Sequence, residues 1–203
     1  SVIGFNPVFD DKYSDDFSFH ASTAICNYSK TIITADSRPL HIFTANNAPQ
    51  PGQQHKDNTL VYTWNDPPFG SDDDTPSDAP SWFKDAPTVY VTEYAGWQDV
   101  IRWGLHTFNN YRYPLPPALQ QKIAVWQKAS GGDTSRFIST AIRFVQDEVR
   151  YLGLEIGANT HRPHAPAEVF AQRFGDCKDK ALLLSTILQH QGIPAYAALV
   201  STD

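Results

Sequence analysis

Short runs of β-branched and aromatic residues recur through the first ninety residues, and polar turn residues separate them. The runs occupy residues 18–26, 30–35, 40–44, 59–64 and 89–92. The segments between them are rich in Asp, Asn, Pro and Gly, which are typical turn formers. Because no helical period accompanies these runs, the pattern predicts an antiparallel β-sandwich or a curved sheet.

After Gly96 the apolar residues recur at the spacing of an α-helix. The stripes comprise Trp97, Val100, Ile101, Leu105 and Phe108; then Leu119, Ile123 and Trp126; and then Ile138, Ala141, Ile142, Val145 and Val149. Asp133, or Thr134 if the boundary shifts, is a candidate N-cap for the third helix. Such stripes are typical of helices that pack against a core. We therefore expect a β-rich domain over residues 1–94 and a mainly helical domain over residues 95–203.

The composition argues against several classes of function. The 203 residues include 16 Lys or Arg and 22 Asp or Glu, which gives a formal net charge of −6. This acidic balance, without a long basic block, argues against a nucleic-acid partner and against an acidic membrane surface as a partner. No run approaches the roughly 18 apolar residues that a membrane-spanning helix needs, so we expect no membrane insertion. The 2 cysteines do not make a disulfide framework.

An acidic, proline-rich stretch at residues 66–80 contains the adjacent carboxylates of Asp72, Asp73 and Asp74. Three such residues raise the question of a calcium site. The alternating oxygen ligands, the Gly at the sixth position and the final Glu of an EF-hand are not present in this stretch. The stretch therefore favours a solvated loop over a calcium site.

Residues 151–200 carry the candidate chemistry, and a predicted helix start is at their centre. Gly175 permits a sharp turn, Asp176 is a good N-cap, and Asp179 three residues later resembles a capping box. Cys177 then lies in the first helical turn and shares a face with Ala181, Leu184 and Leu188. We expect this face to pack inward, with the sulfur at its inner N-terminal end.

The predicted position of Cys177 has a chemical consequence. A helix N-terminus presents unpaired N–H groups and the positive end of the helix dipole, which favour the nucleophilic thiolate. The backbone N–H of Cys177 would also point towards the oxyanion formed when the sulfur attacks an acyl group. The negative charges of Asp176 and Asp179 oppose the thiolate unless Lys178 and Lys180 offset them. The alternative is a buried, inert cysteine, because Cys is among the most buried residue types.

A cysteine nucleophile needs a base within hydrogen-bond reach. His190 follows Cys177 on the same helix, about 20 Å away, and therefore cannot serve. His161 and His164 precede Cys177 and could approach it in space, or could join it as three ligands of a zinc ion. Pro163 prevents the helical geometry of many zinc sites, and His164 is otherwise expected to be a turn residue that fixes the Pro-rich loop.

Four stretches resemble the bacterial transglutaminase-like superfamily, in the group with a preceding β-rich domain called DUF3857. They are Arg150-Tyr151-Leu152-Gly153-Leu154-Glu155, Arg162-Pro163-His164-Ala165-Pro166, Gly175-Asp176-Cys177-Lys178-Asp179-Lys180-Ala181 and Gly192-Ile193-Pro194-Ala195. The upstream half is similar at residues 62–64, 87–92 and 97. The resemblance implies an α+β fold, in which a β-sandwich-like domain precedes the helical, cysteine-bearing half of a transglutaminase-like (papain-like) domain.

The resemblance also implies a Cys-His-Asp arrangement, with the His and Asp on strands that follow the cysteine helix. Cys177 corresponds to the nucleophile, which would attack a peptide or glutamine amide and form a thioester. The resemblance implies no cofactor and no metal, and the partner that it implies is a protein or peptide substrate. The implied location is extracytoplasmic, either periplasmic or secreted, in a bacterium.

The chain begins with Ser1, contains no Met and ends at Asp203, before the positions expected for the His and the Asp. We therefore expect a fragment that is inactive on its own. Its truncated sheet is expected to expose a strand edge at residues 195–200, which would be a site for dimerisation. Two other interpretations stay open: a non-catalytic binding or scaffold protein with the same fold, and a zinc-binding protein that uses His161, His164 and Cys177.

Overall fold

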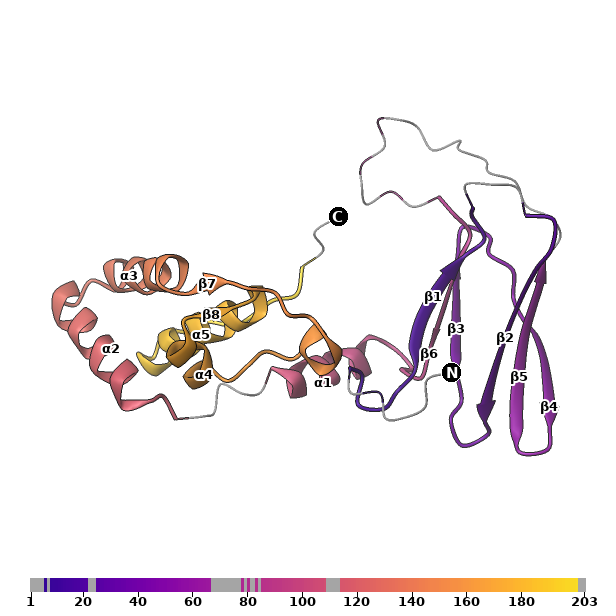
Figure 1. Ribbon diagram of the computed structural model, residues 1–203, viewed down its shortest axis with the longest axis horizontal. Helices are drawn as coiled ribbons and strands as arrows, with labels where there is room; N and C mark the ends of the chain where they lie inside the picture. The colour runs from indigo at the N-terminus through magenta and orange to yellow at the C-terminus, as the bar shows by residue number, and fades with distance from the viewer. Residues whose placement is uncertain are drawn as a thin grey trace. The chain divides into compact units, whose positions relative to one another are not determined.

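The computed structural model describes residues 6, 8–21, 25–66, 78, 80, 83, 85–108 and 114–200 (Figure 1). It combines antiparallel sheets with five α-helices among these residues. The chain divides into two compact units, a β unit formed by residues 11–99 and a helical unit formed by residues 100–200 with the described residues before Asp11. The assignment of residues 1–94 and 95–203 to two domains stays a prediction.

The β unit contains two three-stranded antiparallel sheets. One has the strand order β1-β6-β3, formed by Ser14–Ser18, Thr88–Thr92 and His41–Ala45. The other has the order β2-β5-β4, formed by Tyr28–Ala35, Thr59–Asp66 and Gly52–Lys56. Trp64 of β5 and the two buried valines of β6, Val89 and Val91, belong to one hydrophobic core. The two sheets therefore share a core, as in a sandwich.

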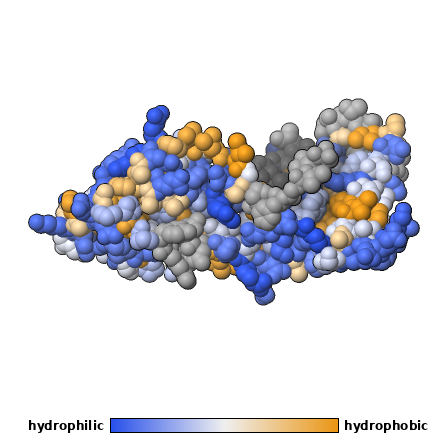
Figure 2. All heavy atoms as spheres, turned by 60° about the horizontal axis from the view of Figure 1, so that its bottom comes forward, coloured by the Kyte–Doolittle hydropathy of each residue, from blue (hydrophilic) through white to orange (hydrophobic). Residues whose placement is uncertain are grey.

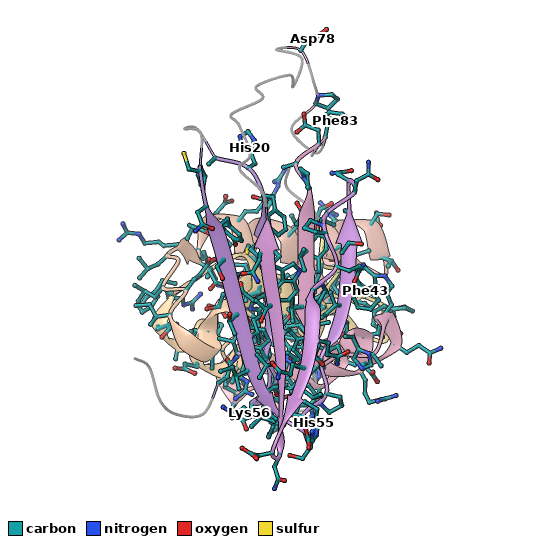
Figure 3. All side chains as sticks on the ribbon, turned by 90° about the vertical axis from the view of Figure 1, so that its right-hand side faces the viewer. His20, Phe43, His55, Lys56, Asp78 and Phe83 are labelled. Carbon is teal, nitrogen blue, oxygen red and sulfur yellow. The ribbon has the colours of Figure 1, made fainter. Side chains whose placement is uncertain are left out.

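The strand predictions were right for β2, β3, β5 and β6, but two other strands differ from expectation. A strand was expected at residues 18–26, but β1 lies earlier in the chain and ends at Ser18. Residues 22–24 lie outside the described part. β4 was not predicted, because all its side chains are exposed and its sequence has no apolar alternation. It forms by pairing with β5, and His55 Nε2 lies 2.7 Å from a carboxylate oxygen of Asp36 near one end of the sheet (Figure 3).

The helical unit packs around a separate core. Its main helices are α2 (Pro117–Ser130), α3 (Thr134–Asp147), α4 (Pro166–Gln172) and α5 (Cys177–His190). The buried apolar side chains of this core are Leu115, Leu119, Ile123, Phe137, Ala141, Phe144, Val145, Val149, Val169, Phe170, Leu183, Ile187 and Leu188. The stripes predicted for α2 and α3 are therefore confirmed as core-facing, and Asp133 is the N-cap of α3, as predicted.

The first predicted stripe does not face a core. Helix α1 spans Trp97–Thr107, as its period indicates, but Trp97, Ile101 and Leu105 are all exposed in the described structure. The period of a sequence specifies an amphipathic helix, whereas burial also requires another element to cover the apolar face. The expectation of core packing was therefore wrong for α1.

Two very short strands bring distant parts of the helical unit together. β7 (Arg150–Tyr151) pairs in parallel with β8 (Phe174–Gly175). The segment in which an unpaired strand edge was expected, residues 195–200, has no regular structure, and its residues 196–200 are exposed. Only Ala195 of that segment packs against the core, and its carbonyl accepts a hydrogen bond from Gln189 Nε2 at 2.5 Å. Dimerisation through this segment stays a prediction.

Two further sequence expectations concern the acidic stretch and membrane insertion. The acidic stretch at residues 66–80 lies mostly outside the described residues. Within the described part, no helix has the length and apolar character that crossing a membrane requires.

Candidate functional site

Cys177 is the first residue of α5, and its thiol is free and exposed. The predicted helix start is confirmed, but the prediction that the sulfur lies on the inner face was wrong. The strongly buried side chains of α5 include Lys178, Asp179, Leu182 and Leu183. Each helical residue turns the chain by about 100°, so the inner face begins one residue after the cysteine. The alternative of a buried cysteine is therefore excluded.

The N-terminus of α5 is capped by a reciprocal pair of hydrogen bonds. The Asp176 carboxylate accepts hydrogen bonds from the N–H groups of Lys178 and Asp179, at 3.1 and 3.2 Å. The Asp179 carboxylate accepts one from the N–H of Asp176 at 3.1 Å, which completes the predicted capping box. Within the described structure, the N–H of Cys177 has no hydrogen-bond partner. The cap thus leaves that N–H group free beside an exposed sulfur.

The residues on either side of Cys177 form a buried ion pair. Asp176 is 1% exposed, and its carboxylate forms a salt bridge with Lys178 Nζ, which is also buried. The second lysine acts elsewhere, because Lys180 Nζ donates to the carbonyl of Val149 at 2.8 Å. The suggestion that both lysines offset the two carboxylates is therefore correct for Lys178 and wrong for Lys180.

Asp179 connects α5 to the loop that precedes α4. Its carboxylate accepts a hydrogen bond from the N–H of His164 at 2.7 Å and lies 3.1 Å from His164 Nδ1. Asp179 is 2% exposed, whereas the His164 side chain is 29% exposed, so the carboxylate is buried and the imidazole remains partly accessible. His164 therefore fixes the Pro-rich loop, as the sequence suggested. The sequence did not identify its carboxylate partner, because the two residues lie 15 positions apart.

Gly175 is required by space rather than by backbone conformation. A Cβ atom at this position would lie 2.8 Å from Asp179 Cβ and 2.9 Å from Asp179 Oδ2. Gly175 lies within β8 and is not among the residues with positive φ, so its backbone conformation does not require glycine. The close approach explains why the residue before the cap has no side chain.

His161 lies among aromatic rings and does not bond the sulfur. Its ring centroid is 5.5 Å from that of Phe9 and 5.4 Å from that of Trp103, and its Nδ1 is buried without a hydrogen-bond partner. Burial lowers the pKa of His161, and the positive charge of Lys178 lowers it further, whereas Glu155 opposes the shift. The imidazole is therefore held in its neutral form.

No side chain among the described residues forms a hydrogen bond with the sulfur of Cys177. His164 is engaged by Asp179, and His190 lies at the opposite end of α5. The described residues also contain no group of three or more His, Cys, Asp or Glu side chains that could hold a metal ion. The structure therefore does not assemble His161, His164 and Cys177 into the zinc site considered from the sequence.

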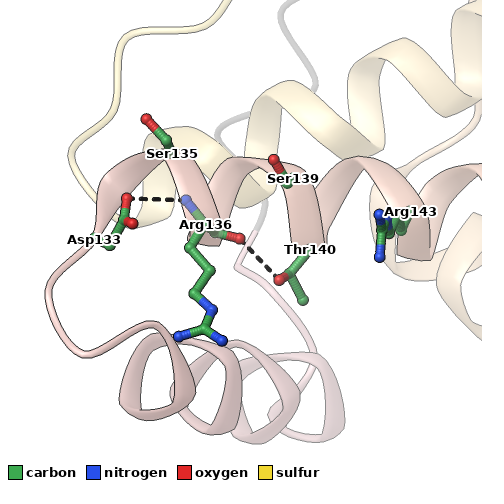
Figure 4. Close-up of a pocket in the computed structure, with 6 residues that line it drawn as sticks. All are labelled: Asp133, Ser135, Arg136, Ser139, Thr140 and Arg143. Carbon is green, nitrogen blue, oxygen red and sulfur yellow. Dashed lines mark hydrogen bonds between the residues drawn. The ribbon is translucent and has the colours of Figure 1, made fainter.

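A hollow of about 460 Å³ lies on the outer face of α3, away from its buried stripe (Figure 4). Its lining residues are Asp133, Ser135, Arg136, Ser139, Thr140 and Arg143. The Asp133 carboxylate accepts from the N–H of Arg136 at 3.1 Å, and the Thr140 hydroxyl donates to the Arg136 carbonyl at 2.8 Å. These bonds serve the helix itself, and neither Cys177 nor a histidine lines the hollow.

The fold resembles a known structure. No protein-family model matches the chain, and no curated protein matches its sequence. The chain is similar to the crystal structure of a "putative protease" from Parabacteroides distasonis, with a TM-score of 0.69 and 11% sequence identity. The match covers 94% of this chain but 36% of that protein, so the chain spans about a third of its length. At this identity the likeness concerns the fold, and this chain shares the fold of part of that protein.

Proposed function

We propose that Cys177 is the nucleophile of a cysteine-dependent peptidase or acyltransferase with a transglutaminase-like fold. The observation that carries the proposal is that an exposed thiol and an unpartnered backbone N–H belong to the same residue, at the start of α5. The sulfur would attack the carbonyl carbon of a peptide or glutamine amide, while the N–H donates to the oxygen that becomes negative. The amine would leave with a proton from a general acid, and water or a second amine would resolve the thioester.

The charges around the sulfur are compatible with this role. The carboxylate of Asp176 is neutralised by Lys178, and that of Asp179 faces His164 and the backbone. Asp176 and Asp179 are both buried, whereas the sulfur of Cys177 is exposed. The two negative groups that the sequence places beside the cysteine are therefore occupied in holding the helix terminus.

The proposed reaction also needs a base, which the described residues do not supply. The resemblance to transglutaminase-like proteins implies a histidine and then an aspartate on strands that follow the cysteine helix. We therefore propose that the 203-residue chain does not turn over amides by itself. The β unit would correspond to the DUF3857-like domain, and the protein would act outside the bacterial cytoplasm. A non-catalytic binding protein is the second candidate, and the lack of a hydrogen-bonded partner for the sulfur among the described residues favours it.

An activated acyl donor tests the nucleophile without its base. p-Nitrophenyl acetate has a good leaving group, so acylation of a reactive thiol needs no general acid. The chain contains a matched control, because Cys26 is also free and exposed. We expect acetylation at Cys177 on the order of tenfold faster than at Cys26, because only Cys177 combines a helix start with an adjacent free N–H.

The modified residue is identified by intact-mass analysis and peptide mapping. Cys177→Ser should abolish the fast acetylation, and Cys26→Ser should leave it intact. Equal rates at the two cysteines, or no acetyl group on Cys177, would overturn the proposal and favour the non-catalytic binding protein.

A further inference from the structure

One imidazole of the helical unit lies in a setting that suits only its neutral form. Hydrophilic residues cover most of the face that Figure 2 shows, and ionisable groups on such a surface are hydrated. By contrast, Nδ1 of His161 is buried and has no hydrogen-bond partner among the described residues. A protonated imidazole is a donor at both nitrogens, so a proton on His161 would leave a charged N–H group buried without an acceptor.

Three rings form a closed cluster around this nitrogen. The ring centroid of His161 is 5.5 Å from that of Phe9 and 5.4 Å from that of Trp103, and the Phe9 and Trp103 centroids are 5.5 Å apart. The three pairs are tilted or edge-to-face, which are favourable arrangements of aromatic rings. Each ring contacts the other two, so displacing one ring weakens the packing of both others. We call Phe9, Trp103 and His161 the His161 cluster.

The His161 cluster joins two places at which the chain passes between its compact units. Among the described residues, these passages are at residues 10–11 and 99–100. Phe9 comes just before the first passage, and Trp103 of α1 comes shortly after the second. All three rings belong to the helical unit. The cluster therefore attaches both passages to the same loop, the one that carries His161.

The first passage is a turn in an unfavourable backbone conformation. Asp10 and Asp11 have φ angles of 53° and 64°, in the left-handed region that residues other than glycine seldom adopt. Such conformations persist where surrounding contacts hold them. Arg162 Nη2 lies 3.8 Å from Asp10 Oδ1, but both side chains are about half exposed, so this ion pair contributes little. The ring contacts of Phe9 therefore restrain the turn more than the ion pair does.

The charges around His161 also oppose a proton on its ring. Burial lowers the pKa of His161 from the ordinary 6.5, the positive charge of Lys178 lowers it further, and Glu155 raises it. The faces of aromatic rings attract cations, but here the net shift of the pKa is downward. The other titratable or charged groups beside the cluster are Asp10 of the N-terminal segment, Arg162 of the loop, and Asp99, Arg102 and His106 of α1.

We propose that the His161 cluster is an acid-sensitive switch, which attaches both passages to the helical unit while His161 is neutral and releases them when its imidazole gains a proton. The charged ring turns towards water, and Phe9 and Trp103 lose a neighbour. The residues that connect the two units then move more freely, while the core of the helical unit stays folded. The inference goes beyond the proposed function and does not depend on Cys177.

Hydrogen exchange followed by mass spectrometry tests the switch, because it measures local opening peptide by peptide. Rates are divided by the intrinsic rate at each pH and compared at about pH 7.5 and about pH 5, on either side of the ordinary histidine pKa. We expect protection of residues 97–108 and 157–163 to fall about fivefold or more at the lower pH. Residues 181–188 of α5, within the helical core, should keep their protection.

Three variants separate the switch from a general effect of acid. His161→Phe keeps a ring at this position without a titratable group, so both peptides should stay protected at both pH values. Phe9→Ala should lower the protection of both peptides already at the higher pH, although Phe9 is distant from them in the sequence. The control is His190→Phe, at an exposed histidine at the end of α5, which should respond to pH as the parent protein does.

Three results would overturn the inference. The first is unchanged protection of the two peptides in the parent protein between the two pH values. The second is an equal fall in His161→Phe, which would assign the response to another group. The third is a simultaneous loss of protection at residues 181–188, because the helical unit would then unfold as a whole rather than release the passages.

Discussion

The first turn of α5 has two sides with opposite character. On one side the charged groups of Asp176, Lys178 and Asp179 are buried and satisfied by one another and by the backbone. On the other side Cys177 is exposed, with a free thiol and a free N–H. Neighbouring residues thus divide two tasks: the buried polar groups fix the helix terminus, and the exposed residue is left available for chemistry.

This difference shows that acidic residues beside a cysteine in the sequence can be committed to hydrogen bonds elsewhere. A carboxylate that accepts several hydrogen bonds inside the protein is committed to structure, and its removal leaves buried donors unpaired. A residue that makes no such contacts can be changed at little cost to stability. Substitutions on the two sides of the turn should therefore differ in how much unfolding free energy they remove.

The largest effect is expected for Asp179→Ala. The substitution leaves the N–H groups of Asp176 and His164, and the His164 imidazole, without their buried acceptor. We expect a loss of about 3 kcal/mol in the free energy of unfolding, measured with urea. The control is Asp147→Ala, at an exposed acid at the end of α3, which should change stability by less than about 0.5 kcal/mol. Similar values for the two variants would contradict the structural role of the buried side.

Gly175→Ala is expected to have the next largest effect. The added Cβ would approach Asp179 Cβ to 2.8 Å, so the capping box must shift. We expect a loss of about 1–3 kcal/mol by chemical denaturation. Gly104→Ala is a matched control in α1, where a Cβ meets no atom within 4 Å, and it should stabilise the helix by up to about 1 kcal/mol. Equal effects of the two alanines would show that the turn before Cys177 has room for a side chain.

The pH dependence of stability should reveal the lowered pKa of His161. Its pKa is lowered from the ordinary 6.5, so the unfolded chain takes up a proton more readily than the folded chain. The contribution of His161 is therefore fully present above 6.5 and is lost as the pH falls through the folded pKa. We expect His161→Phe to reduce the loss of stability between about pH 7.5 and about pH 5, measured from urea midpoints. An identical loss in the variant would show that His161 is not held neutral.

Cys177→Ala is expected to have the smallest effect on stability. The exposed side chain makes no hydrogen bond among the described residues, so the unfolding free energy should change by less than about 0.5 kcal/mol. The measurement is the same urea titration. A loss above about 1 kcal/mol would place the sulfur among the packing groups and remove the contrast between the two sides.

Local signals predicted the start of α5 well. The N-cap role of Asp176, the capping box with Asp179 and the position of Cys177 all follow from residues within four positions of one another. Capping depends on short-range hydrogen bonds, so sequence spacing is sufficient to identify it. The bond between Asp179 and His164 joins residues 15 positions apart, and no spacing rule predicts it.

Apolar periodicity predicted helices more reliably than it predicted burial. α1 and α2 both form where the period indicates, yet Ile123 of α2 is buried and Ile101 of α1 is exposed. For β4 the period failed in the opposite way, because it did not predict a strand that the structure contains. β4 has no apolar pattern, and it forms by pairing with β5. In each case the decisive information lies in what a second element contributes.

The sequence by itself determined where the helices and most strands lie, how α5 is capped, and that a cysteine stands at its first position. Those features depend on backbone sterics, side-chain period and hydrogen bonds between near neighbours. Only the tertiary structure decided that the sulfur faces outward, that Gly175 leaves room for Asp179, and that β7 pairs with β8. These depend on the packing of segments far apart in the chain, which sets the rotation of a helix and the pairing of a strand.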